Sequence, residues 1–394
     1  MKLKKTIRDL DDISIKTILL RTDYNVPIVN GQVKSDFRIK ASLETLRYLL
    51  AANCRITIIS HLGRPADKNT TLSLEPVAKT LSKLLNHKVD FLADCIGDDI
   101  LDQVNAHKAG EIVMLENLRF YPQEEANDLV FAARLAQYGE VFVDDAFAVM
   151  HRKHASIVRI PTLLPALAGL LAEKEVTSLD HLLNAPTKPL VIILAGAKVS
   201  EKIEVLNNLI TQANTLIIGG AMANTFLAAA GLKVGKSLYE PDQLSTAQKI
   251  KRQADKQGVK LILPQDVVVA NQLGESATIK HKLATEVTAE DYIVDLGPKT
   301  MKLIIAALGG AKTIFWNGTL GITEVAKFAQ SSKILAKHVA DSKAQSIIGG
   351  GDTTGFLENA NLLKGFSFVS TGGGATLDLL AGKNLPGWDA LADK

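Results

Sequence analysis

Four arginines follow short apolar runs in the first half of the chain. They are Arg38, Arg64, Arg119 and Arg152. A single arginine is more often a solvated surface residue, but the guanidinium fork binds pairs of phosphate or carboxylate oxygens, so several at strand ends suit a small polyanion. His61, which alone would be interpreted as a structural histidine, is near Arg64. We therefore interpret His61 as a further ligand of that polyanion.

Glycines follow the apolar runs of the second half instead. They occur in Gly196-Ala197-Lys198, Gly219-Gly220, Gly297-Pro298, Asn317-Gly318, Gly349-Gly350-Gly351-Asp352 and Thr371-Gly372-Gly373-Gly374. Because glycine has no side chain, backbone amides at these positions can approach a phosphate chain closely. The first half therefore offers groups that bind an acid, and the second half offers groups that bind a nucleotide.

The glycine triplet at 349–351 is predicted to open a helix. Its free amides would bind phosphate, and Asp352 would supply a carboxylate for magnesium. The alternative is that Asp352 only caps the helix. A second helix is predicted to begin near Ser200 and to hold Lys202 in its first turn, where the helix dipole disfavours a cation. A bound phosphate would offset that cost; otherwise Lys198 and Lys202 are simply exposed.

Several other patterns do not complete a site. The run Gly231-Leu232-Lys233-Val234-Gly235-Lys236-Ser237 is one residue short of a Walker A loop and follows no predicted strand, and no dinucleotide fingerprint follows the first strand of either half. His151 and His154 have no third ligand at a suitable spacing for zinc. The two cysteines, Cys54 and Cys95, match no metal spacing and indicate inert thiols in a reducing compartment.

Short β-branched runs alternate with segments of helical period along the whole chain. The predicted strands are 17–20, 55–59, 112–115, 141–143, 190–194, 215–218, 260–263, 292–294, 313–315, 346–348 and 366–369, and the predicted helices include 39–50, 74–85, 130–138, 201–211 and 326–340. This alternation predicts parallel sheets, whose ligands bind beyond the carboxyl ends of the strands. We expect an α/β fold of two Rossmann-like domains, each a parallel sheet flanked by helices, with a hinge at 160–189 and a cleft between them.

Composition excludes several classes of function. The 394 residues carry a formal net charge of +3 with no basic run, so nucleic acid is not an expected partner. Residues 1–12 contain no apolar core of a signal peptide, and no apolar stretch approaches the roughly 18 to 20 residues of a membrane span. We expect a cytoplasmic protein that does not contact a membrane.

The motifs in their order resemble those of the phosphoglycerate kinase family, glycolytic enzymes that exchange phosphate between 1,3-bisphosphoglycerate and ADP. The motifs are Arg21-Thr22-Asp23-Tyr24-Asn25-Val26-Pro27, Ser60-His61-Leu62-Gly63-Arg64-Pro65, Glu116-Asn117-Leu118-Arg119-Phe120, Asp145-Ala146-Phe147, Gly196-Ala197-Lys198-Val199-Ser200, Trp316-Asn317-Gly318 and the two glycine triplets. The resemblance spans nearly the full length of the chain. It implies a monomer with a 3-phosphoglycerate domain at 1–168, joined by the tail 377–394, and a nucleotide domain at 169–376.

The resemblance also implies roles for individual residues. The 3-phosphoglycerate ligands would be Asp23, Asn25, Arg38, His61, Arg64, Arg119 and Arg152. The nucleotide ligands would be Lys198, Lys202, Asn317, Glu324, Gly350, Gly351, Asp352 and Thr353, to which we add Gly220 and Gly297 as glycines at strand ends. Arg38, Lys198 and Lys202 would be catalytic, and Asp352 would hold Mg²⁺ beside ATP or ADP.

The chain departs from the family pattern at a few positions. Ala148-Val149-Met150 replaces a Gly-Thr-Ala run, Ala195 replaces a glycine, and Thr319 replaces a proline. We interpret these as changes in loop shape around Arg152 and the nucleotide loops.

Direct phosphoryl transfer by hinge closure is the expected reaction. Its loose transition state requires positioning and charge stabilisation rather than a covalent enzyme intermediate. Two other functions stay open from the sequence: an NAD-dependent two-domain dehydrogenase, weakened by the missing fingerprint, and a non-catalytic hinged protein that binds phosphorylated acids.

Overall fold

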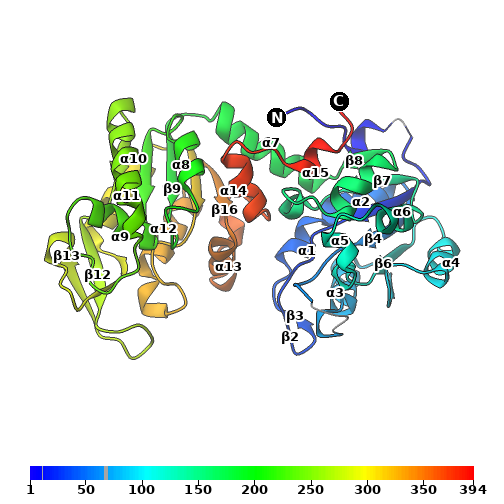
Figure 1. The fold of residues 1–394 in the computed structure, drawn as a ribbon, viewed down its shortest axis with the longest axis horizontal. Coiled ribbons are helices and arrows are strands. Elements are labelled where there is room, and N and C mark those ends of the chain that lie inside the picture. The colour runs from blue at the N-terminus through cyan, green and yellow to red at the C-terminus, as the bar shows by residue number, and fades with distance from the viewer. Residues whose placement is uncertain (11, 66–69) are drawn as a thin grey trace. The chain divides into compact units, whose positions relative to one another are not determined.

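The computed structural model describes residues 1–10, 12–65 and 70–394, and they form two compact units (Figure 1). The first unit comprises Met1–Thr177 and Asn384–Lys394, and the second comprises Ser178–Lys383. The division falls inside helix α7 (Leu170–Asn184), some residues beyond the boundary at 168 that the sequence suggested. Residues 377–383 belong to the second unit because helix α14 (Gly374–Leu380) packs against α8 (Ile203–Leu209).

The first unit contains a six-stranded parallel sheet in the order β5-β6-β4-β1-β7-β8. Its strands are β1 (Thr17–Arg21), β4 (Arg55–Ile59), β5 (Val89–Leu92), β6 (Ile112–Leu115), β7 (Val141–Asp144) and β8 (Ala166–Ala168), beside a small hairpin of β2 (Ile28–Val29) and β3 (Gln32–Val33). Its helices are α1 (Phe37–Ala41), α2 (Leu43–Ala51), α3 (Glu75–Leu85), α4 (Asp98–Ala106), α5 (Pro122–Glu125), α6 (Leu129–Ala136) and α15 (Pro386–Asp389). Strand β1 is buried at all five residues, as expected for a parallel strand that is covered on both faces.

The second unit repeats this plan with a parallel sheet in the order β11-β10-β9-β15-β16-β17. Its strands are β9 (Leu190–Leu194), β10 (Thr215–Ile218), β11 (Lys260–Ile262), β15 (Thr313–Asn317), β16 (Gln345–Gly349) and β17 (Phe368–Val369). Its further helices are α9 (Gly220–Ala229), α10 (Leu244–Gln257), α11 (Pro298–Leu308), α12 (Gln330–Ala340) and α13 (Gly351–Asn359). The expected α/β class with two parallel sheets is therefore confirmed.

A second, antiparallel sheet in this unit was not anticipated. It has the order β13-β12-β14 and consists of β12 (Asp266–Ala270), β13 (Ile279–Leu283) and β14 (Tyr292–Leu296). The run 292–294 was predicted as a strand of a parallel sheet, and this assignment is wrong because β14 pairs only with β12 among the described strands. The sequence missed β5 because three of its four residues are only half-buried, and it missed β8 because Ala-Leu-Ala is also typical of a helix.

The longest described helix, α7, has 15 residues. A membrane span needs roughly 20 predominantly apolar residues. None of the helices in the described ranges is both long enough and apolar enough to cross a membrane.

Candidate active site

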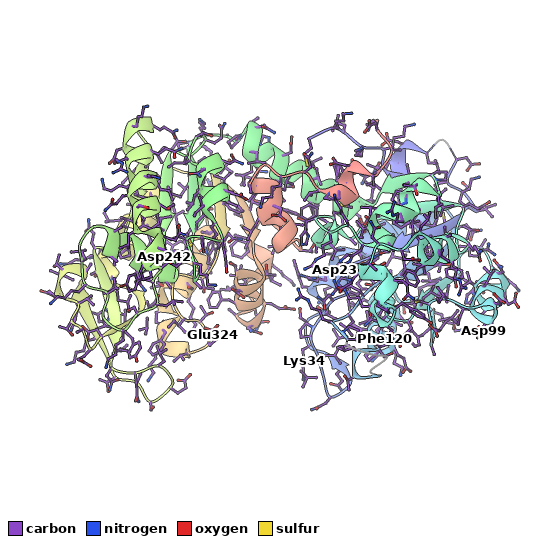
Figure 2. All side chains as sticks on the ribbon, in the orientation of Figure 1. Asp23, Lys34, Asp99, Phe120, Asp242 and Glu324 are labelled. Atoms are coloured by element: carbon purple, nitrogen blue, oxygen red, sulfur yellow. The ribbon has the colours of Figure 1, made fainter. Side chains whose placement is uncertain are left out.

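Asp23 joins Arg38 and His61 at the carboxyl end of β1 (Figure 2 labels Asp23). Asp23 Oδ2 accepts a hydrogen bond from Arg38 Nη1, and Asp23 Oδ1 lies 4.0 Å from His61 Nδ1. Arg38 lies on helix α1, so its predicted position at a strand end is wrong: the β2–β3 hairpin separates this helix from β1. Asp23 nevertheless brings the Arg38 guanidinium to the strand ends, where the other ligands are.

Arg21, to which the sequence analysis gave no role of its own, is fully buried beneath these residues. Its Nε donates to Ser156 Oγ over 2.8 Å, and its Nη2 lies 3.8 Å from Glu124 Oε1. Glu124 is also fully buried and accepts hydrogen bonds from the Ser156 amide and hydroxyl. The pair satisfies each charge inside the protein, and it anchors the region around Ser156 to β1.

His61 is held as a neutral imidazole. Burial is the main cause that lowers its pKa well below the ordinary value, and the charges of Arg21, Arg119 and Arg38 act in the same direction. Arg21 Nη2 lies 3.3 Å from His61 Nδ1, and a guanidinium can only donate. The His61 proton is therefore on Nε2, which leaves this N–H available as a donor to an acidic ligand.

Arg119 and Arg152 complete a group that we call the arginine cluster, which consists of four arginines and the neutral His61 (Arg21, Arg38, Arg119, Arg152 and His61). Arg119 Nη1 donates to the Gly63 carbonyl over 2.7 Å, and its Nε lies 3.0 Å from Glu125. Burial lowers the pKa of Arg119, and the charges of Arg21 and Arg152 add to this effect while Glu125 opposes it. Like charges at interacting distance repel one another, and an anionic ligand would relieve this repulsion.

Two predicted ligands lie at the exposed edge of this cluster. The Asn25 side chain accepts a hydrogen bond from the Gly63 amide over 2.9 Å, and Arg64 follows directly as an exposed residue. Gly63 is thus held by Asn25 through its amide and by Arg119 through its carbonyl. The structure therefore places six of the seven predicted 3-phosphoglycerate ligands on segments that follow β1, β4, β6 and β7, and the seventh, Arg38, on α1 after the β2–β3 hairpin.

In the second unit, Lys202 is buried against the ends of two central strands. Its Nζ donates to the Ala195 carbonyl, after β9, and to Asn317 Oδ1, at the end of β15. Burial lowers the pKa of Lys202 to about 8, and the charge of Asp352 partly offsets that effect. The predicted helix start near Ser200 is wrong: α8 begins at Ile203, so Lys202 precedes the helix, and the first-turn dipole argument does not apply.

The glycine triplet does open a helix, as predicted. Gly350 is the N-cap of α13 with φ of 94°, and Asp352 lies inside the first turn, so Asp352 is not merely the cap. Thr353 is fully buried, and its hydroxyl accepts a hydrogen bond from the Gly318 amide over 2.7 Å. A Cβ at Gly350 would lie 2.8 Å from Asn317 Nδ2, a buried donor with no partner in the described structure. Only glycine fits this position.

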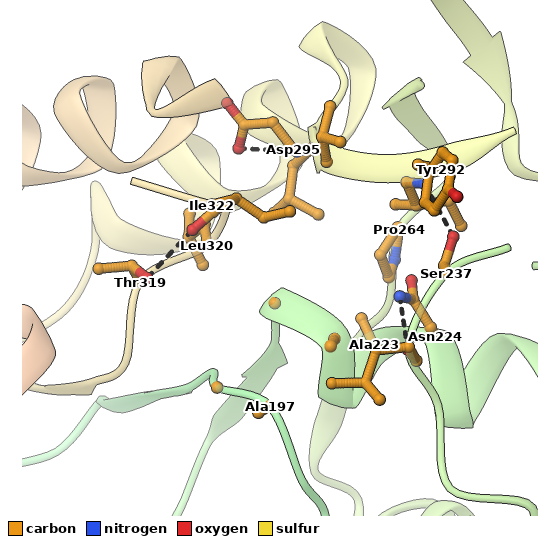
Figure 3. A pocket seen from close by; sticks show the side chains of 18 of the residues that line it. Ala197, Ala223, Asn224, Ser237, Pro264, Tyr292, Asp295, Thr319, Leu320 and Ile322 are labelled. Atoms are coloured by element: carbon orange, nitrogen blue, oxygen red, sulfur yellow. Dashed lines mark hydrogen bonds between the residues drawn. The ribbon is translucent and has the colours of Figure 1, made fainter. Parts of the chain in front are cut away.

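A cavity of about 510 Å³ lies beside these groups (Figure 3). Of the predicted nucleotide ligands, Gly220, Glu324 and Asp352 line it. A neighbouring cavity shares Glu324 and Asp352 and adds Gly351. The sequence analysis missed most of the wall, which includes Asn224, Ser237, Leu238, Pro264, Tyr292 and Asp295.

The remaining predicted ligands do not line either cavity. Lys198 is exposed, with Nζ 3.7 Å from Glu201. Gly297 is the N-cap of α11, where a Cβ would lie 2.3 Å from Asp266 Cγ, so close packing explains this glycine without a ligand.

Burial also raises the pKa of Asp295, on the cavity wall, to about 6. Its carboxylate is occupied: it accepts hydrogen bonds from Ser331 and from the Leu296 amide. We interpret Asp295 as a structural link between β14 and α12.

The described residues contain no group of three acidic, histidine or cysteine side chains that could enclose a metal ion. Asp352 offers an exposed carboxylate in the first turn of α13. Mg²⁺ fits such a donor, because it commonly keeps several waters and binds one or two carboxylates together with substrate phosphates.

Comparison with known proteins shows the family to which this chain belongs. Residues 7–383 match the family model described as phosphoglycerate kinase. The chain belongs to the phosphoglycerate kinase family. It is 46% identical over 396 residues to the phosphoglycerate kinase of Aquifex aeolicus, with all of both chains covered. It is 43% identical to the phosphoglycerate kinase of Pelotomaculum thermopropionicum, over 99% of this chain and 100% of the relative.

Two solved phosphoglycerate kinase structures have the same fold. That from Coxiella burnetii matches with a TM-score of 0.86 at 40% identity, and that from Pyrococcus horikoshii with 0.87 at 30% identity. Both matches cover 98% of each chain. The family assignment made from the ordered motifs is thereby confirmed, and neither the dehydrogenase nor the binding-protein alternative receives support.

Proposed function

We propose that the chain is an ATP:3-phosphoglycerate phosphotransferase of glycolysis and gluconeogenesis, which moves a phosphoryl group directly between 1,3-bisphosphoglycerate and Mg²⁺-bound ADP. Membership of the phosphoglycerate kinase family supports this activity. The structural observation that supports it is that each unit gathers groups suited to binding an anion, and that these groups differ in kind between the two units. One set consists of clustered arginines around a neutral histidine, and the other of Lys202 with the amides at the start of α13.

On the acid side, the cations would bind the two ends of 3-phosphoglycerate. Arg119 is already positioned by Gly63 and Glu125, and Arg38 by Asp23. Fixed guanidinium groups lose little conformational freedom when they bind, and each can contact a carboxylate or phosphate in a bidentate manner. His61 would donate its Nε2–H to the same ligand without adding a charge. The exposed edge of the same site would be completed by Arg64, Arg152 and Asn25.

On the nucleotide side, the cavity would accept the base and ribose, with Glu324 beside the ribose hydroxyls. The amides at Gly350 and Gly351 and the Lys202 ammonium would bind the phosphates. Asn317 would orient Lys202, as it does in the described structure. Asp352 would hold Mg²⁺, which supplies charge neutralisation on the phosphate oxygens.

Transfer itself needs no proton donor or nucleophile from the protein. Arg38 would face the acyl phosphate from one side, and Lys198 and Lys202 would face the migrating phosphoryl group from the other. Their positive charges would then stabilise the negative charge on the three equatorial oxygens while the phosphorus moves from the donor oxygen to the acceptor oxygen. We further propose a cytoplasmic monomer whose units close when both substrates bind, since in-line transfer requires donor and acceptor oxygens to reach one phosphorus atom.

A coupled assay tests the activity. The purified chain should form ATP from 1,3-bisphosphoglycerate and ADP in the presence of Mg²⁺, and the rate should vanish when Mg²⁺ is chelated. No ATP formation, with a folded chain that binds 3-phosphoglycerate, would instead favour the non-catalytic binding function. Small-angle scattering tests the closure separately: an unchanged radius of gyration with both substrates would contradict it.

A further inference from the structure

A carboxylate from a distant part of the chain holds the turn between Lys198 and Lys202. Glu240 Oε2 accepts hydrogen bonds from the amides of Val199 and Ser200, the latter over 3.1 Å, and Glu240 Oε1 accepts a third from the Ser200 hydroxyl. Hydrogen bonds that a carboxylate accepts are stronger than those between neutral groups. Glu240 therefore fixes two of the three residues that separate the lysines.

The amides of Val199 and Ser200 have no other acceptor in the described part of the chain. The turn lies between β9 and α8, so it belongs to neither a strand nor a helix. Within the turn, the Lys202 amide donates to the Val199 carbonyl over 2.9 Å. Because regular secondary structure does not hold this segment, its conformation depends on Glu240.

Helix α9 holds the segment from which the Glu240 side chain extends. The Glu240 amide donates to Thr225 Oγ1 over 3.1 Å, and Thr225 is fully buried. Two residues before Glu240, the Leu238 carbonyl accepts a hydrogen bond from Asn224 Nδ2 over 3.0 Å (Asn224 is labelled in Figure 3). A side chain can orient a functional loop only where its own position is fixed by packing and hydrogen bonds. Glu240 meets this condition.

The two lysines depend on the turn in different ways. Lys198 is exposed, and its Nζ lies 3.7 Å from the exposed Glu201, an ion pair of a kind that contributes little. The position of the Lys198 ammonium is therefore set mainly by its backbone. Lys202 is buried, and its Nζ donates to the Ala195 carbonyl and to Asn317 Oδ1. A shift of the turn would withdraw the Lys202 ammonium from both oxygens.

We propose that Glu240 is a positioning residue for phosphate binding. Its carboxylate holds the turn at Val199 and Ser200, and the turn places the ammonium groups of Lys198 and Lys202 for the nucleotide phosphates. Glu240 lines neither of the two cavities described above, so it acts through the lysines and not on the nucleotide. This inference rests on the proposed function, since it assumes that the two lysines bind phosphate.

The negative charge of Glu240 gives the test a definite sign. If Glu240 acted only through its charge, its removal would strengthen the binding of Mg²⁺-ADP, because a repulsion of the phosphates would be lost. If Glu240 only stabilised the fold, its removal would lower the free energy of unfolding and leave the Kd of the folded chain unchanged. Positioning predicts weaker binding by a chain that is still folded.

Calorimetric titration of the full chain with Mg²⁺-ADP measures the Kd, and circular dichroism confirms that each variant is folded. Glu240→Ala should raise the Kd about tenfold, as for the loss of a charge-assisted hydrogen bond, while the Kd of 3-phosphoglycerate stays the same. Glu240→Gln should recover most of the affinity, because its amide oxygen can still accept from both N–H groups. An unchanged or lower Kd for Mg²⁺-ADP in Glu240→Ala would overturn the inference.

Glu201→Ala is the matched control. Glu201 carries the same charge beside Lys198 but accepts no hydrogen bond from the turn in the described structure, so its removal should not weaken the binding of Mg²⁺-ADP. Ser200→Ala removes one of the three hydrogen bonds at an exposed position; it should raise the Kd about two- to fivefold, and have no further effect when combined with Glu240→Ala. Equal weakening by Glu201→Ala, or additive effects of Ser200→Ala and Glu240→Ala, would contradict the assignment.

Lys202→Ala distinguishes this inference from the proposed function. If Lys202→Ala weakens the binding of Mg²⁺-ADP but Glu240→Ala does not, only the role of Glu240 fails. If the unmodified chain binds no Mg²⁺-ADP, both proposals fail.

Discussion

The arginine cluster of the first unit and the cavity of the second unit present different groups to the anions that we propose they bind. In the cluster, charged side chains form ion pairs: the fully buried Arg21 with the fully buried Glu124, the partly exposed Arg38 with Asp23, and the buried Arg119 with the exposed Glu125. In the second unit, Lys202 is the buried cation and its contacts are neutral oxygens, while the remaining groups are backbone amides and apolar walls. The first region depends on charge, and the second depends on backbone shape.

This difference determines how each region should respond to substitution. Removing one member of a buried ion pair leaves the charge of its partner buried and uncompensated. Such a substitution therefore lowers the free energy of unfolding of the whole unit. Changing a glycine that shapes a helix start acts through local strain instead. The four predictions below test that contrast, from the largest expected effect to the smallest.

Arg21→Met should destabilise the chain by about 3–5 kcal/mol, because Glu124 is fully buried and would lose its cation. Denaturant unfolding measures the change. The double variant Arg21→Met with Glu124→Gln removes both charges and keeps one acceptor oxygen for Ser156, so it should recover part of the loss. A double variant no more stable than the single one would show that the charge pair is not the cause.

Arg38→Ala should lower kcat about 10²- to 10³-fold with a smaller change in the KM for 3-phosphoglycerate, as expected for a group that stabilises charge mainly in the transition state. Steady-state kinetics in both directions measure it. Arg64→Ala is the comparison: Arg64 is exposed at the rim, so it should mainly raise KM. A pure KM effect of Arg38→Ala would contradict the catalytic assignment.

Gly350→Ala should lower the free energy of unfolding by about 1–3 kcal/mol, because the residue has φ of 94° and its new Cβ would clash with Asn317. Gly351→Ala is a close control, since nothing lies within 4 Å of a Cβ at that position. Thermal denaturation of the two variants decides the matter. Equal stability would mean that the conformation at Gly350 is not constrained as described.

Lys202 should make nucleotide binding depend on pH. Its pKa is lowered to about 8, so the ammonium is charged below that pH and neutral above it, and the affinity for Mg²⁺-ADP should fall several-fold between about pH 7.5 and 9. Lys202→Arg should remove this dependence because guanidinium stays charged.

The stability contribution of Lys202 has the opposite sign. Folding favours the neutral amine, so this contribution is present above the unfolded pKa near 10.5 and is lost as the pH falls through about 8. Binding that is flat with pH in the unmodified chain would argue against Lys202 as a phosphate ligand.

Much of the framework follows from local sequence. The β-branched runs at 190–194 and 313–315 form central strands β9 and β15, because buried parallel strands must be apolar on both faces. The start of α13 could also be predicted from the sequence, since the glycines before Asp352 can adopt the backbone conformation that the turn requires. These features depend on neighbours in the chain and on burial.

The sequence alone also determined the family, through ordered motifs such as Asp23 to Asn25 and Trp316 to Gly318. Only the tertiary structure decided which partners those motifs have. Arg21 became a buried anchor because Glu124 and Ser156, more than a hundred residues away, meet it inside the fold. Asn224 on α9 and Tyr292 on β14, which lie far apart in the chain, likewise meet in the wall of one cavity. Pairings of this kind join distant segments, so no local pattern of residues contains them.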